Sequence, residues 1–319
     1  MTAFLNGLQG SGLVVALVLV PAALVLSLLV FWKRFVRKRN RRSPLTSELL
    51  RPPGFGLQER IEDLTHDINS DLASIMLVPL MILGIYQIQI QANVTRNPRF
   101  LGILFLLTGL AFVVYLAVKL FRRVDARQTY REALAGELAT AQLLEPVLAR
   151  RGRLLHDIQA PGFNIDHVVV SPGGVFAVET KHRLKPTEGK AKDQARVTFD
   201  GKVLHFPDWQ ETKPIDQARA QARWLSERLT KSTGLSVQAR PVVALPGWFV
   251  DCRAPSDVVV TNPKSWQFML KPRRNEPGLA PDAIQRIAFQ VEQLCRMPAP
   301  EESRSVGRSA REDQSRTHG

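Results

Sequence analysis

Two acidic residues and a lysine at the ends of a valine-rich hairpin are the residues of this chain best suited to chemistry. In the stretch GFNIDHVVVSPGGVFAVETKH, Asp166 precedes one apolar run, and Glu179 and Lys181 end the next. Both runs are apolar at every position, which is typical of strands that are buried on both faces. Charged groups at the ends of buried strands are costly unless they are compensated. These three residues are therefore candidates for a functional site.

The turn between the two runs predicts how these residues face one another. Ser171-Pro172-Gly173-Gly174 is a turn signal. In a symmetric four-residue turn, Asp166 lies directly opposite Glu179, with Cβ atoms roughly 4.5–5.5 Å apart. Lys181 lies two residues beyond Glu179 and shares its face of the sheet. A Pro-Gly turn of type II fits a tight hairpin poorly, so a bulge that shifts the register by one residue stays an alternative.

Two facing carboxylates suggest a bound cation. They destabilise a sheet unless a positive charge compensates them, and their oxygen atoms suit Mg²⁺ or Mn²⁺. Such an ion could activate a water molecule that Lys181 helps to orient. The sequence thus predicts a Mg²⁺ or Mn²⁺ site at Asp166 and Glu179. The alternative is that Glu179 and Lys181 form a surface pair and that Asp166 is a turn residue.

An α/β pattern surrounds these residues and must position them. Apolar residues recur at three- and four-residue steps over 125–150, which predicts a helix. A second amphipathic helix is expected over 214–231, with Pro214 in its first turn and Gly234 just past its end. We expect strands at 153–158, 165–170, 175–181, 196–206, 239–245 and 257–261, and further helices at 263–270 and 281–296.

The ordered set of motifs resembles a known group of nucleases. Asp166 followed by Glu179-Thr180-Lys181 resembles the signature of the PD-(D/E)xK nuclease superfamily. More specifically, residues 130–272 are similar to the nuclease-related domain family, NERD. The further segments that carry this resemblance are Gly136-Glu137, Ile165-Asp166-His167-Val168-Val169-Val170, Gly174-Val175-Phe176, Pro214-Ile215-Asp216-Gln217-Ala218 and Pro241-Val242-Val243.

The resemblance implies a fold, a reaction and a set of site residues. The fold would be a restriction-endonuclease-like core, a mixed sheet flanked by helices, and the reaction would be hydrolysis of DNA phosphodiester bonds. The implied catalytic residues are Glu137, Asp166, Glu179, Lys181 and Gln217. The implied ligands of Mg²⁺ or Mn²⁺ are Asp166, Glu179, the backbone carbonyl of Thr180, and Glu137. One departure is His182, which follows the lysine where many relatives have asparagine.

Basic residues near this site fit DNA as a partner. The candidates for nucleic-acid binding are His182, Arg183, Lys185, Lys213 and Arg219. Contacts from such residues to phosphate would make binding depend on salt. The alternatives are that His182 is an exposed residue at a strand end and that the others belong to a solvated helix face and a loop. A membrane-tethered binding or scaffold protein without catalysis is the alternative function.

The first 124 residues predict a helical transmembrane anchor. Uncharged apolar stretches at about 13–32, 74–92 and 100–118 are long enough to span a bilayer, since 20 helical residues rise about 30 Å. The sequence favours a retained anchor over a cleaved signal peptide for 13–32, because its basic cluster follows it. The glutamines near the end of 74–92 leave a partly interfacial helix as an alternative.

Charge predicts how the chain is oriented and divided. The net charge of +14 favours an anionic partner or a membrane surface. The basic run 33–42 and the basic residues after 118 place the link 33–71 and the rest of the chain in the cytoplasm, with the N-terminus outside. We expect an integral protein of a bacterial inner or plasma membrane. Its parts would be the anchor 1–124, a NERD-like domain 125–297 and a disordered tail 298–319.

Composition also excludes several classes of protein. Apolar residues make up 45% of the chain, which excludes wholesale disorder. The cysteines, Cys252 and Cys295, are too few for a framework of several disulfides. They also lack the spacing of a zinc site.

Overall fold

The structure is a computed structural model, and it divides into two compact units. It describes residues 48–92, 97–149, 151–186, 195–274 and 276–296, together with Leu24, Ser27, Leu28, Val30 and Phe31. One unit comprises Met1–Leu45 and Glu62–Arg127, and the other comprises Thr46–Ile61 and Gln128–Gly319. The second unit is therefore interrupted in sequence by part of the first. The predicted tail 298–319 and most of the predicted span 13–32 lie outside the described residues.

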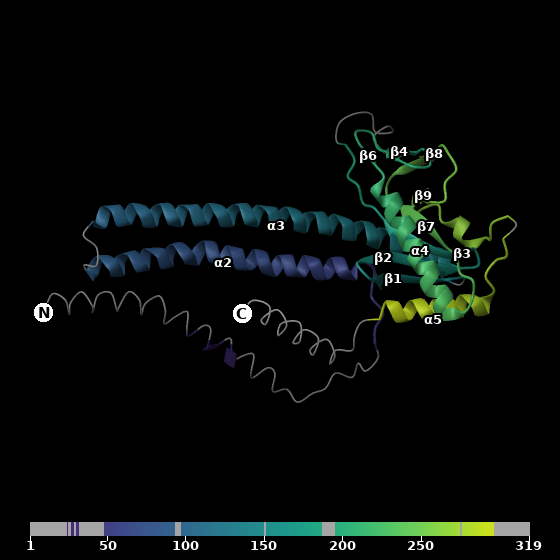
Figure 1. Cartoon of the computed structure of the whole chain (residues 1–319), viewed down its shortest axis with the longest axis horizontal. Helices are drawn as coiled ribbons and strands as arrows, with labels where there is room; N and C mark the ends of the chain where they lie inside the picture. Colours follow the sequence, from purple (N-terminus) through teal and green to yellow (C-terminus); the bar gives the residue numbers. More distant parts are fainter. Residues whose placement is uncertain are drawn as a thin grey trace. The chain divides into compact units, whose positions relative to one another are not determined.

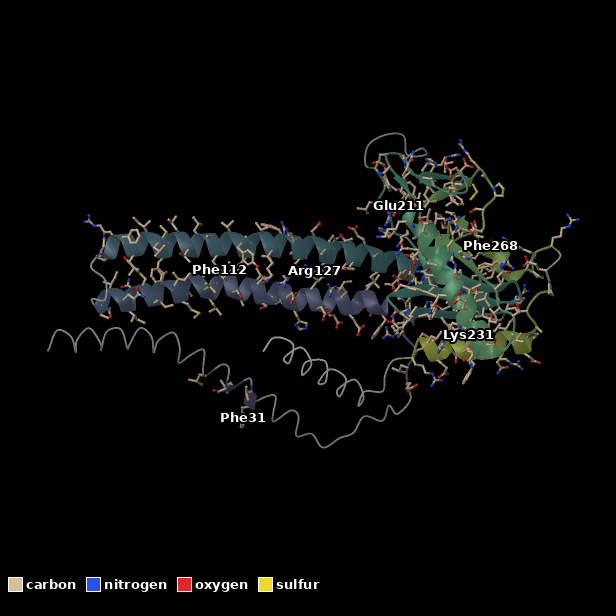
Figure 2. All side chains as sticks on the ribbon, in the orientation of Figure 1. Phe31, Phe112, Arg127, Glu211, Lys231 and Phe268 are labelled. Carbon is tan, nitrogen blue, oxygen red and sulfur yellow. The ribbon has the colours of Figure 1, made fainter. Side chains whose placement is uncertain are left out.

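The first unit is built on two long helices. They belong to α2 (Phe55–Gln91) and α3 (Pro98–Leu148), which run side by side in this unit (Figure 1). Within the described ranges, these two helices are long and apolar enough to cross a membrane. Apolar side chains such as Met81 and Leu106 are more than half exposed, and carbon dominates the sticks around Phe112 (Figure 2). The predicted span 100–118 lies within α3, and the predicted span 74–92 lies within α2 except for its last residue.

An ion-pair cluster joins α2 to α3 beside these predicted spans. Asp71 is 4% exposed, and it binds Arg123 and lies 3.4 Å from the Nζ atom of Lys119. Arg123 also lies 2.8 Å from Asp67. Because two cationic side chains pair with two carboxylates, the negative charge of the buried Asp71 is compensated.

The helices are longer than the sequence pattern predicted. The third apolar stretch and the helix expected over 125–150 form the single helix α3, and the acidic part of the link 33–71 lies in α2. The predicted boundary between residues 124 and 125 falls inside α3, close to the division of the units after Arg127. Residues 46–61, expected in the link, belong to the second unit.

A mixed five-stranded sheet forms the centre of the second unit, as the α/β prediction required. The strand order is β1-β2-β3-β7-β9. The strands are β1 (Arg153–Ala160), β2 (Phe163–Ser171), β3 (Gly174–Thr180), β7 (Ala239–Ala244) and β9 (Val259–Thr261). The first three pair antiparallel, whereas β7 is parallel to β3 and β9.

Helices cover both faces of this sheet. Helices α4 (Lys213–Thr233) and α5 (Pro281–Leu294) lie on one face (Figure 1). Their residues Leu225 and Val291 belong to the same buried cluster as Val168 of β2. On the other face, Leu144 of α3 packs with Val169. This two-sided burial explains why the central strands are apolar at every position. Helix α4 has proline in its first turn and ends at Gly234, whose φ of 69° is left-handed, as predicted.

A second, smaller sheet differs from the sequence prediction. Its order is β6-β5-β4-β8, and its strands are β4 (Arg196–Phe199), β5 (Leu204–His205), β6 (Gln210–Glu211) and β8 (Phe249–Cys252). The single strand expected over 196–206 is wrong, because the Asp200 carboxylate accepts the amides of Lys202 and Val203 and turns the chain. The helix expected over 263–270 is only the 3₁₀ turn η1 (Gln267–Leu270).

Candidate active site at the end of the central hairpin

The β2–β3 hairpin has the predicted register. Paired residues run without interruption from His167↔Val178 to Ser171↔Gly174, so Pro172 and Gly173 form a turn without a shift. A Cβ atom on Gly173 would lie 2.1 Å from the carbonyl oxygen of Met269, so only glycine fits there. The same register, continued by one position, places Asp166 opposite Glu179.

Asp166 and Glu179 are both buried at this end of the hairpin. Their exposed fractions are 7% and 4%. The Thr180 amide donates to Asp166 Oδ2 at 2.7 Å, and Lys181 Nζ lies 2.5 Å from Glu179 Oε1. Gln221 of α4 donates its side-chain amide to Glu179 Oε2. Both carboxylate oxygens of Glu179 are therefore engaged by side chains.

A third buried carboxylate, that of Glu137, comes from α3. A Cβ atom on Gly136 would lie 2.7 Å from the Cβ atom of His182. This glycine lets α3 approach the end of β3, and the next residue, Glu137, is 6% exposed. Glu137 accepts a hydrogen bond from the Gly54 amide. Its Oε2 atom has no hydrogen-bond partner among the described residues.

The electrostatics of the three acids favour a positively charged ligand. Burial, with repulsion from Asp157 and Glu179, raises the pKa of Glu137 to about 8. Burial also raises the pKa of Asp166 well above its usual value, helped by repulsion from Glu179 and Glu137 and opposed by the Thr180 amide and Lys181. Since one lysine faces three buried carboxyl groups, a cation would stabilise their ionised forms.

The donor set fits a hard divalent cation, although the side chains do not enclose one as they stand. Asp166, Glu179 and Glu137 offer carboxylate oxygens, which suit Mg²⁺ or Mn²⁺. Among the described residues, no group of three or more His, Cys, Asp or Glu side chains is arranged to hold a metal ion. Glu179 would have to release Lys181 or Gln221 to bind one.

Two residues of this site were missed from the sequence. Asp157 of β1 is 1% exposed and has a positive φ of 49°. Its carboxylate accepts Arg51 Nη1 at 2.8 Å and Asn164 Nδ2 at 2.9 Å. Gln221, which contacts Glu179, donates at 3.1 Å to the Asn164 carbonyl. The sequence signal for Gln221 is its position four residues after Gln217, on the same helix face.

Two other predicted residues make different contacts from those expected. Gln217 has a buried Oε1 atom without a hydrogen-bond partner among the described residues. It lies one turn before Gln221, and it is Gln221 that contacts Glu179. For Thr180, the contact with Asp166 comes from its amide, whereas the predicted ligand is its carbonyl.

Two of the predicted DNA-binding residues are paired with carboxylates of the protein itself. Arg183 forms two hydrogen bonds to Glu211, with Nε 3.0 Å from Oε2. Arg219 holds Asp257 in the same two-pronged way, at 2.9 and 2.8 Å.

The other candidates differ in their surroundings. Lys185 Nζ lies 5.9 Å from the ring centroid of Trp248, and Lys213 is exposed where α4 begins. His182 is half-buried against α3 at Gly136.

A histidine pair joins β1 to β2, with His167 buried and His156 half-buried. The Nδ1 atoms of His156 and His167 are 2.9 Å apart. Burial lowers the pKa of His156 to about 4 and that of His167 well below its usual value, with repulsion from His156 adding to the latter. Both rings are therefore neutral at pH 7.

Comparison with known proteins identifies the region that contains the site. No curated protein and no solved structure matches the chain. The family model described as the nuclease-related domain, NERD, matches residues 132–246. This span begins in α3 before Glu137 and ends just after β7, so it includes the central hairpin and α4. Residues 132–246 of this chain are therefore similar to the nuclease-related domain family.

Proposed function

We propose that this protein is a membrane-anchored, divalent-metal-dependent nuclease that hydrolyses DNA phosphodiester bonds. The observation that carries the proposal is the set of three buried carboxyl groups, those of Asp166, Glu179 and Glu137, beside Lys181. Buried acids that raise one another's pKa values are characteristic of functional sites. The match of residues 132–246 to the nuclease-related domain model supports the same conclusion.

In this proposal, the acids hold a cation and the lysine acts on water. Asp166, Glu179, Glu137 and the Thr180 carbonyl would hold Mg²⁺ or Mn²⁺. When bound, the cation polarises the phosphoryl group and lowers the pKa of water. The Lys181 ammonium, released from Glu179, orients the attacking water by donating a hydrogen bond to it. Gln217 contacts the substrate, while Gln221 holds the Glu179 carboxylate in position.

The proposed partner and location follow from charge and hydropathy. Most of the positive excess lies in residues 119–297, so the domain attracts a polyanion such as DNA. His182, Lys185 and Lys213 are the proposed phosphate contacts. Arg183 and Arg219 would contribute by exchanging their carboxylate partners. The apolar helices α2 and α3 anchor the protein in a bacterial membrane, with the nuclease-like domain in the cytoplasm.

Cleavage by the full chain in detergent tests the proposal. Linear and supercoiled DNA are incubated with Mg²⁺ or Mn²⁺ and the wild type, Asp166→Ala or Asp208→Ala. Asp208 is an exposed aspartate outside the site and serves as the matched control. We expect Asp166→Ala to abolish cleavage and Asp208→Ala to retain it. If the wild type and Asp166→Ala are equally inactive on every DNA form with both metals, the proposed nuclease activity is refuted.

One observation favours a second candidate, a DNA-binding scaffold without catalysis. Lys181 and Gln221 already engage both oxygens of Glu179, so this carboxylate is satisfied without a cation. Equilibrium binding of a fluorescent DNA duplex distinguishes the two functions. DNA binding that persists unchanged in Glu179→Ala, with no metal bound to the wild type, supports the scaffold. Metal binding that Glu179→Ala abolishes supports the nuclease.

A further inference from the structure

A segment far upstream in the sequence completes the carboxylate site. We call residues 48–56 the strap, because they precede and begin α2 and contact the rest of the second unit, which we call the nuclease-like unit. They belong to the same compact unit as residues 128–319. The family match begins only at residue 132. The strap therefore contributes structure that the family match does not include.

The strap is held by backbone and side-chain contacts to the two residues that follow α5. The Arg51 amide donates to the Cys295 carbonyl at 2.8 Å, and Leu50 forms an antiparallel bridge with Arg296. Glu48 accepts Arg296 Nη1 at 3.0 Å. These contacts hold the strap beside the end of α5, so its next residues have a defined position.

The first contact between the strap and the acids is made by Gly54. Its φ is +71°, and a Cβ atom there would lie 2.2 Å from Leu134 Cδ1. Only glycine allows this approach to α3. The Gly54 amide donates to Glu137 and lowers its pKa, against the effect of burial. The strap thus supplies a hydrogen-bond donor to one of the three buried acids.

The second contact is made by Arg51. Its Nη1 atom lies 2.8 Å from Asp157 Oδ2, and the two side chains are 16% and 1% exposed. The other oxygen of Asp157 accepts Asn164 Nδ2 at 2.9 Å. Gln221 then donates to both the Asn164 carbonyl and the Glu179 carboxylate. A chain of polar contacts therefore runs from Arg51 to Glu179.

We propose that Arg51 and Gly54 are positioning residues of the carboxylate site and that residues 62–127 of α2 and α3 are an insertion in the sequence of the nuclease-like unit. Arg51 acts through Asp157, Asn164 and Gln221 on Glu179, and Gly54 acts on Glu137. Without the guanidinium group, the buried carboxylate of Asp157 loses its ion pair with Arg51 and repels Glu137 more strongly. The catalytic meaning of this inference rests on the proposed function, whereas the contacts themselves do not.

The test uses the full chain in detergent and two readouts. Mn²⁺ affinity is measured by electron paramagnetic resonance, and hydrogen exchange is measured in peptides that cover residues 133–141 and 155–166. The variants are Arg51→Met and Arg51→Gln, since glutamine keeps a donor but no charge. Arg240→Met is the matched control, because its side chain is also 16% exposed and pairs with Glu276 outside the site.

We expect Arg51→Met to weaken Mn²⁺ binding at least tenfold, the lower end of the usual loss for residues that orient ligands. Exchange in both peptides should accelerate, while Arg240→Met leaves Mn²⁺ affinity and exchange there unchanged. If Arg51→Met fails to fold, Arg51→Gln is the deciding variant, and we again expect weaker Mn²⁺ binding and faster exchange. Wild-type affinity and exchange in a folded Arg51 variant would overturn the inference.

Failure of the proposed function gives a different result. If the wild type binds no Mn²⁺, the metal-dependent function fails, and hydrogen exchange alone decides the role of the strap. Faster exchange confined to the two peptides in the Arg51 variants then supports the positioning role. Unchanged exchange, or equal acceleration in Arg240→Met, overturns it.

Discussion

At the scale of single residues, Gln221 links Glu179 to Asn164, which in turn contacts Asp157. We predict that Gln221→Leu lowers the cleavage rate about 10- to 100-fold, as is usual when a residue that orients a metal ligand is lost. The physical reason is that leucine removes the amide that donates to Glu179 and to the Asn164 carbonyl. Single-turnover cleavage with saturating Mg²⁺ measures the effect. Gln285→Leu, at an exposed position of α5, is the control, and equal rates for both variants would contradict the prediction.

The histidine pair gives the domain a dependence on pH. The pKa of His156 falls from 6.5 to about 4 because the ring is buried. Between these values the unfolded chain binds a proton that the folded chain does not. The stabilisation is therefore fully present above about pH 6.5 and is lost as the pH falls towards 4. The neutral His167 beside it contributes in the same direction.

We predict that replacing both rings, as His156→Leu with His167→Leu, reduces the acid sensitivity of folding. Between pH 7.5 and 4.5, the wild type should lose at least about 2.5 kcal/mol more unfolding free energy than the double variant, because His156 alone accounts for nearly two pKa units at roughly 1.4 kcal/mol each and His167 adds to the loss. Chemical denaturation at both pH values measures this difference. His66→Leu, at an exposed site on α2, is the control. An identical pH slope in the wild type and the double variant would argue against neutral buried rings.

The sequence predicted part of the site because a hairpin register is a local property. Asp166 and Glu179 lie on adjacent strands joined by a short turn, so counting residues from that turn was enough. Asp157 could not be placed in this way, because its role depends on a positive φ and on Arg51, which is 106 residues away. Gln221 likewise depends on how α4 packs across the sheet. Such contacts arise from tertiary structure and leave no periodic signal.

At the scale of elements, the close approach of α3 to the end of β3 positions Glu137. We predict that Gly136→Ala destabilises the domain by about 1–3 kcal/mol, the usual cost of overpacking. The added methyl group would lie 2.7 Å from the Cβ atom of His182 and force α3 away. Thermal unfolding and the Mn²⁺ affinity of the full chain measure both consequences. Gly84→Ala, where a Cβ atom meets nothing within 4 Å, should change neither; equal effects at both sites would refute this explanation.

Long elements were predicted better than short ones, for a physical reason. Strands β2 and β3 and helix α4 bury enough residues to show a continuous or periodic apolar pattern. The strands β5 and β6 have two residues each, and two residues carry no period. Their position depends on packing instead, as in the stacked rings of Phe206 and Trp209, whose centroids are 4.4 Å apart.

At the scale of the whole molecule, the domain boundary was the hardest feature to predict. The polar link 33–71 gave no motif, yet part of it, 46–61, belongs to the nuclease-like unit. Sequence patterns describe neighbours along the chain, whereas this assignment depends on contacts with residues near 157 and 295. A chain that begins at the family match would lose the strap and its contacts with the acids.

The two native cysteines allow a test of membrane orientation without an introduced thiol. Both are free thiols, with Cys252 exposed and Cys295 buried, so an impermeant maleimide should label Cys252. If the nuclease-like domain is cytoplasmic, we predict that labelling requires permeabilised cells. Partial desolvation of the sulfur atom, together with repulsion from Asp251, raises the pKa of Cys252 although the residue as a whole is exposed, so labelling at pH 8 is needed to increase the reactive thiolate.

The test compares maleimide labelling of intact and permeabilised cells, and Cys252→Ser is the control for labelling at other sites. Because the exposed thiol lies in β8 of the second unit, its accessibility reports the side of the membrane on which that unit lies. A cytoplasmic domain gives at least tenfold more labelling after permeabilisation. Equal labelling of intact cells would place the domain outside, against the positive-inside rule. A nuclease on that side would meet only extracellular DNA, so the same measurement also decides which DNA the proposed active site encounters.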